Sequence, residues 1–70
     1  MKITYDKIAD AMYMYFQKGK VAKTIALNDR LIVDIDKRGK MVGLEILDAS
    51  SQISKKEIEL GIKTGIPVLV

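Results

Sequence analysis

The sequence predicts an α+β domain, with a five-stranded antiparallel β-meander followed by one short C-terminal helix. The first observation is a hairpin signature over residues 31–47, where two runs rich in Val, Ile and Leu flank the polar turn 36–40. The second is a helix-capping signature at residues 54–57. The connections between the expected strands are short, which favours a meander.

The hairpin arms also predict a register. Each arm carries an apolar triplet at a spacing of two residues: Leu31, Val33 and Ile35, then Val42, Leu44 and Ile46. One buried face holds both triplets if Val33 lies opposite Leu44. Ile35 then meets Val42. A slip of one residue would bring aspartates onto the apolar face, and a buried face resists such a slip.

Three further strands are expected before the hairpin, over residues 2–5, 11–17 and 21–27. The link from Asp6 to Asp10 has at either end a side chain that readily bonds the local backbone. The second strand places Met12, Met14 and Phe16 on one face and Ala11, Tyr13 and Tyr15 on the other. A helix is the competing interpretation, because Ala and Met are good helix formers. Aromatic residues at a spacing of two favour the strand.

A short helix is expected over residues 55–60. Ser54 and Glu57 fit a capping box, in which each side chain bonds a free amide of the first turn. Gly61 is placed to end the helix in a left-handed conformation. The rival interpretation is a strand, because apolar residues also alternate over residues 58–62.

The composition excludes several kinds of chemistry. The 70 residues form one domain, with strands in 1–50 and the helix and an apolar tail in 51–70. There is no Cys or His, so disulfides, thiolate zinc sites and imidazole bases are excluded, and we expect a non-enzymatic protein without a cofactor. The N-terminus has no signal-peptide core, and no apolar run approaches the about 20 residues of a membrane span. A cytoplasmic location is therefore expected.

The small size favours association with another chain. A domain of this length buries only about 60% of its unfolded surface. The second strand is apolar on both faces, and the tail 66–70 is apolar too. We therefore expect a homodimer or a small protein partner, bound by Tyr13 and Tyr15 or by Val68 and Leu69. The alternative is that the helix and tail cover this surface within one monomer.

Three carboxylates form the candidate reactive group. Asp34, Asp36 and Glu45 are expected on one face of the hairpin, where Gly43 opposite Asp34 leaves room. Oxygen ligands suit Mg²⁺ or Ca²⁺, and paired carboxylates also divide acid and base roles. The alternative is a solvated sheet face in which Asp36 begins the turn.

Five cations lie in two turns: Lys18, Lys20, Lys37, Arg38 and Lys40. In a meander these turns lie at the same end of the sheet, next to the strand that carries Tyr13 and Tyr15. Phosphate contacts together with aromatic stacking would bind nucleic acid. The alternative is ordinary turn charge, which keeps the domain soluble and hinders edge pairing.

The residues of the first two-thirds of the chain resemble a family of short prokaryotic proteins known as domain of unknown function 2283. The matching segments are Tyr5-Asp6, Ala9-Asp10-Ala11-Met12-Tyr13, Thr24, Val33-Asp34-Ile35-Asp36, Gly39, and Val42-Gly43-Leu44-Glu45-Ile46-Leu47 with Asp48-Ala49-Ser50. Ile8 departs from the acidic residue expected there.

The resemblance implies a small β-rich fold, no established activity and no catalytic residue. It also implies an antitoxin-like or partner-binding role, because some members are encoded beside small toxin-like proteins. The family's recurrent positions fall at Tyr5, Asp10, Tyr13, Asp34 and Glu45. We therefore expect a protein that acts by association. Weak nucleic-acid binding is the second hypothesis, and a carboxylate metal site is the third.

Overall fold

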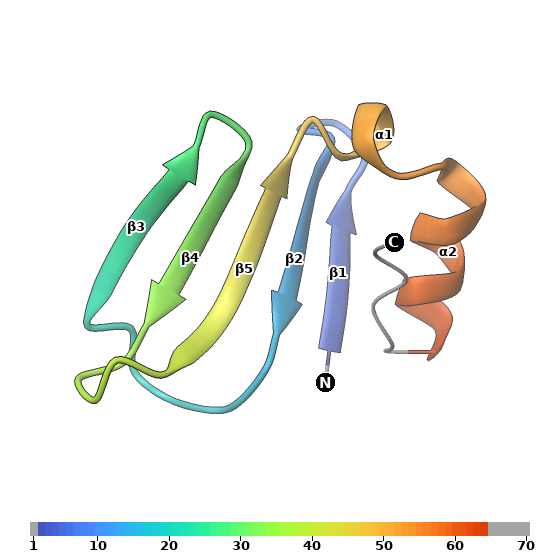
Figure 1. The fold of residues 1–70 in the computed structure, drawn as a ribbon. Helices are drawn as coiled ribbons and strands as arrows, with labels where there is room; N and C mark the ends of the chain where they lie inside the picture. The colour runs from blue at the N-terminus through green and yellow to red at the C-terminus, as the bar shows by residue number, and fades with distance from the viewer. Residues whose placement is uncertain (1, 65–70) are drawn as a thin grey trace.

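The structure confirms the α+β class, with one five-stranded antiparallel sheet followed by helices (Figure 1). It is a computed structural model that describes residues 2–64. The strands are β1 (Lys2–Asp6), β2 (Ala11–Tyr15), β3 (Lys23–Asn28), β4 (Leu31–Ile35) and β5 (Met41–Leu47), and the helices are α1 (Ala49–Gln52) and α2 (Lys55–Thr64). All five expected strands therefore form, with ends that differ by at most two residues.

The strand order is β1-β2-β5-β4-β3, so the predicted meander is wrong. After β2 the chain crosses the end of the sheet and begins β3 at the far edge (Figure 1). The crossover holds seven residues, 16–22, which reach about 20 Å when extended. Three strand spacings amount to only about 14 Å. The connection is thus long enough to pass two strands, and residue alternation does not specify which strands are neighbours.

The hairpin forms, but its register changes near the turn. Val33 lies opposite Leu44, as predicted. Ile35 lies opposite Met41 rather than Val42, because the register shifts by one residue after Asp34. That part of the predicted register is wrong.

The turn explains this shift. The Asp36 amide donates to the Lys40 carbonyl at 2.9 Å, which closes a turn with an odd number of residues. Gly39 adopts the positive φ of 81° that this turn requires. Pairing the two apolar triplets on one face would require a loop with an even number of residues. The bulge between Asp34 and Ile35 shifts the register by one residue, so the triplets share a face although the turn is odd-numbered.

The core lies between one face of the sheet and the helices. Its buried members are Ile3, Met12, Met14, Ile46, Ala49, Ile53 and Ile58. We call this side of the sheet the helix face. The opposite side, which we call the open face, carries the alternate residues of the strands, among them Tyr13, Tyr15, Asp34, Gly43 and Glu45.

Helix α2 is longer than expected. Ser54 caps it as predicted, since the Glu57 amide donates to the Ser54 hydroxyl at 3.2 Å. Gly61 does not end the helix but is buried within it, which also overturns the strand interpretation of residues 58–62. The short helix α1 was not expected. No helix within residues 2–64 has the length and apolar content needed to cross a membrane.

Candidate functional site

Tyr13 reaches across β5 on the open face and connects β2 to β4. Its side chain leaves β2, and its hydroxyl donates a 2.5 Å hydrogen bond to Oδ2 of Asp34 on β4. The other carboxylate oxygen of Asp34 accepts a 2.6 Å bond from the Thr24 hydroxyl on β3. Because β5 lies between β2 and β4, this polar network spans four adjacent strands.

Gly43 on β5 makes this crossing possible. A Cβ atom at Gly43 would lie 2.5 Å from both Cε1 and Cζ of the Tyr13 ring, which is far closer than atoms approach. The space that the sequence predicted beside Asp34 is therefore filled by the Tyr13 ring. It is not an open binding position.

The two tyrosines predicted to bind a partner have different surroundings. Their ring centroids lie 4.5 Å apart with a tilt of 54°. Burial, and then the hydrogen bond to Asp34, raise the pKa of the Tyr13 hydroxyl well above its usual range, so it remains a donor. Tyr15 is 45% exposed, so its ring is available to a ligand.

The predicted carboxylate group does not assemble. Asp34 is bonded as described above, and Oδ1 of Asp36 accepts the amides of Arg38 at 2.8 Å and Lys40 at 2.9 Å. These backbone bonds, with that from Lys40 the largest cause, lower the pKa of Asp36. Glu45 lies opposite Tyr13. Asp34 and Glu45 share the open face as predicted, but no three acidic side chains of the described part of the chain lie close enough to hold a metal ion.

A second Tyr–Asp pair lies on the helix face. The Tyr5 hydroxyl donates a 2.5 Å hydrogen bond to Oδ1 of Asp10, which adopts a left-handed backbone conformation with φ of 53°. Asp10 Oδ2 also accepts the Ser50 hydroxyl at 2.7 Å, and Oδ1 accepts the Ser50 amide at 3.1 Å. The Asp10 carbonyl accepts the Ala49 amide at 2.9 Å. Asp10 thus joins the β1–β2 link to the start of α1.

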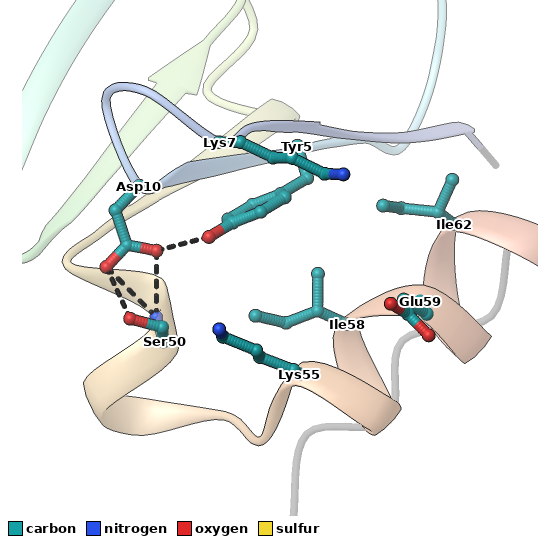
Figure 2. A pocket seen from close by; sticks show the side chains of 8 residues that line it. All are labelled: Tyr5, Lys7, Asp10, Ser50, Lys55, Ile58, Glu59 and Ile62. Atoms are coloured by element: carbon teal, nitrogen blue, oxygen red, sulfur yellow. Dashed lines mark hydrogen bonds between the residues drawn. The ribbon is translucent and has the colours of Figure 1, made fainter.

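A cavity of about 590 Å³ lies beside this pair, between β1 and α2 (Figure 2). Figure 2 shows Ile58 and Ile62 pointing from α2 toward Tyr5, with Lys7 and Lys55 at the sides. The hydrogen bonds from Tyr5 and then from Ser50 lower the pKa of Asp10. A carboxylate with a lowered pKa is a weak base, so this arrangement serves structure better than proton transfer.

The cations predicted from the turns do lie at one end of the sheet. Residue pairing puts the end of β2 beside the start of β1, and the end of β4 beside the start of β3, so loops 16–22 and 36–40 share that end (Figure 1). Pairing adds two lysines that the sequence analysis missed, since Lys2 lies opposite Tyr15 and Lys23 opposite Ile35. We call this set the basic end: Lys2, Lys18, Lys20, Lys23, Lys37, Arg38 and Lys40.

The other partner-binding candidates, Val68 and Leu69, lie outside the described residues, as does the whole tail 66–70. Sequence reasoning also missed the role of Ser50. No local signal marks Ser50 as the partner of Asp10, because the two residues are 40 positions apart.

Comparison with known proteins fits these features. Residues 2–50 match the family described as Protein of unknown function (DUF2283). An uncharacterized protein of Methanocaldococcus jannaschii is 37% identical over 60 residues, which make up 86% of this chain and 51% of that protein. The chain thus spans about half the length of this curated relative. No solved structure matches the chain.

The family match includes all five strands, both Tyr–Asp pairs and Ser50, and it ends before α2. It covers more than half of the chain and agrees with the resemblance seen in the sequence. The chain therefore belongs to the DUF2283 family of proteins of unknown function.

Proposed function

We propose that this protein is a non-enzymatic binding protein that associates with a second copy of itself through strand β3. The observation that carries the proposal is the position of β3 at an edge of the sheet, where only β4 lies beside it among residues 2–64. The helices lie at the opposite edge, next to β1 (Figure 1). An edge strand presents free amides and carbonyls that readily pair with another strand.

The side chains of β3 favour such pairing. Between Lys23 and the end of the strand there is no charged residue, so nothing in that part repels a second strand. Leu27 is 61% exposed and Ile25 is only half-buried. A paired strand would cover apolar surface that the monomer leaves in water.

An antiparallel pairing about a two-fold axis fits this edge if it is centred on Ile25, before the register shift between Ala26 and Asn28. With Ile25 of each copy opposite the other, Lys23 of one copy lies opposite Leu27 of the second copy. The two lysines then stay apart, and the basic end of each copy lies near the turn with Asp29 of the other. The helix faces of both copies also lie on the same side, giving one continuous sheet.

The non-enzymatic part of the proposal rests on the polar groups described above. Asp10, Asp34 and Asp36 all accept hydrogen bonds from neighbouring groups of the same chain. The chain has neither His nor Cys. These three carboxylates thus serve as structural acceptors, which supports a non-enzymatic role.

The proposal predicts a dimer that two substitutions on β3 abolish. We expect light scattering to give twice the chain mass of 7.8 kDa, with a melting temperature that rises with protein concentration. Ala26→Lys combined with Leu27→Lys adds two lysines to each copy, so the dimer interface would hold four additional positive charges. This double variant should be a monomer. Both positions are exposed, so the fold should be retained.

The matched control is Ile8→Lys with Ala9→Lys, which adds the same charges at exposed positions of the β1–β2 link. This control should remain a dimer. If the wild-type protein is a monomer over a hundredfold concentration range, the homodimer is wrong, and β3 would instead pair with a strand of a different small protein. If the dimer persists with both lysines on β3, this edge is not the dimer interface.

A further inference from the structure

We propose that the basic end binds single-stranded nucleic acid, with its lysines on the phosphates and a base stacked on Tyr15. This proposal does not rest on self-association, because a monomer presents the same end of the sheet. Three features of the molecule support it: the charge of this end, the groove within it and the rigidity of the crossover.

The charge of the basic end is strongly one-sided. Seven exposed cations gather there. Within loops 16–22 and 36–40 the single carboxylate is Asp36, which accepts two amides of its own turn and pairs with Arg38 at 3.8 Å. The opposite end of the sheet carries the acidic residues of the other turns: Asp6, Asp10, Asp29 and Asp48. The net charge of +3 therefore understates the positive field at one end. Such a field attracts phosphates and depends on salt.

A groove of about 730 Å³ lies at this end, between the strand ends and the crossover. Tyr15 and Phe16 line it together with Val21, and Lys2 and Lys18 lie on its wall. An aromatic surface flanked by cations is the arrangement that binds unpaired bases, because every base has a face that stacks. The bases of a duplex are already stacked on each other, so this groove favours a single strand.

The crossover is held in place before any ligand binds. The Phe16 amide donates to the Val42 carbonyl at 2.9 Å, and the Gln17 side chain donates to the Met41 carbonyl at 2.8 Å. The Ala22 amide donates to the Ile35 carbonyl at 2.8 Å. Lys18 and Lys20 thus lie on a loop fixed at both ends, which lowers the entropic cost of binding.

The experiment measures fluorescence anisotropy of labelled oligothymidylate and oligouridylate of twelve nucleotides with the full chain. If roughly four phosphates are contacted, affinity should fall about 50-fold when salt rises from 50 to 200 mM. Lys18→Glu with Lys20→Glu should abolish binding. Tyr15→Ala should weaken it about tenfold through loss of stacking.

The matched control is Lys55→Glu with Lys56→Glu on α2, which changes the net charge equally and should bind nearly as wild type. Melting curves confirm that each variant folds. An equal loss of affinity in the two double-lysine variants, or no binding by the wild-type protein at 50 mM salt, would overturn the proposed site. Unchanged affinity in Tyr15→Ala would overturn the stacking contact. Binding to phosphatidylserine vesicles without binding to oligonucleotides would replace the proposal with a membrane surface.

Discussion

At the scale of single residues, Tyr13 and Gly43 act as one unit, because the ring of the first occupies the space of a side chain at the second. Gly43→Ala must displace this ring and weaken its hydrogen bond to Asp34. We expect the free energy of unfolding to fall by about 1–3 kcal/mol, as for other overpacked sites. Chemical denaturation measures this loss.

A double-mutant cycle tests whether the ring is the cause. In a Tyr13→Ala background the space over Gly43 is open, so the same Gly43→Ala change should cost much less. An equal cost in both backgrounds would mean that the backbone of Gly43, rather than the Tyr13 ring, sets the requirement for glycine.

Asp10 makes stability depend on acid pH. Its pKa in the folded protein is lowered below 3.8, first by the Tyr5 hydroxyl and then by Ser50. A lowered pKa means that the stabilisation is present above 3.8 and is lost as the pH falls through the folded value. In Asp10→Asn the side-chain amide group would face the hydroxyl and amide donors of Ser50. We therefore expect this variant to have a lower melting temperature than the wild type at neutral pH.

The difference in melting temperature between Asp10→Asn and wild type should then become smaller as the pH falls below the ordinary pKa of an aspartate. Asp29→Asn in the β3–β4 turn removes the same charge and serves as the control, with a small difference at every pH. A difference for Asp10→Asn that stays constant into strong acid would show that the charge of Asp10 contributes nothing to the stability of the folded protein.

Single residues were predictable from the sequence where their partners are local. Asp6 accepts the amides of Ile8 and Ala9, and Asp36 closes its own turn, as residue type and position indicate. The contact between Tyr13 and Asp34 spans 21 positions and requires that β5 lie between β2 and β4. Alternation assigned each residue to a face of its own strand but did not bring the two together.

At the scale of elements, the sequence predicted the strands better than their order. Alternating apolar residues fix which side of a strand is buried, and the turn residues fix where the strand ends. Neither the alternation nor the turn residues determine whether β2 pairs with β3 or with β5. The crossover 16–22 is long enough for both choices, so the decision depends on the packing of the whole sheet.

The length of α2 shows a similar limit. Gly61 has the sequence signature of a helix end, yet it is buried in the middle of the helix. A glycine inside a helix costs about 1 kcal/mol relative to alanine. The burial of Ile58 in the core stabilises α2 by more than this cost, so the helix continues past Gly61. The signal at Ser54 was reliable because a cap depends only on the first turn.

At the scale of the whole molecule, the two proposals use different surfaces. Self-association uses the outer edge of β3, whereas nucleic-acid binding uses the end of the sheet formed by the two loops. The meander was the wrong topology, but antiparallel strands still return the loops after β2 and β4 to the same end. The predicted gathering of charge therefore survived the error in strand order.

The stability of the whole domain should depend on α2, although the residues matched to the family end at Ser50. Ile58 on α2 is only 2% exposed and completes the core formed by the strands. Ile58→Ala should lower the free energy of unfolding by about 2–4 kcal/mol, a large part of the roughly 5 kcal/mol typical of 70 residues. Ile62→Ala, the same change one turn later at a position 43% exposed, should cost under about 1 kcal/mol. Urea denaturation compares the two variants. Equal losses would mean that α2 stabilises the sheet without packing through Ile58.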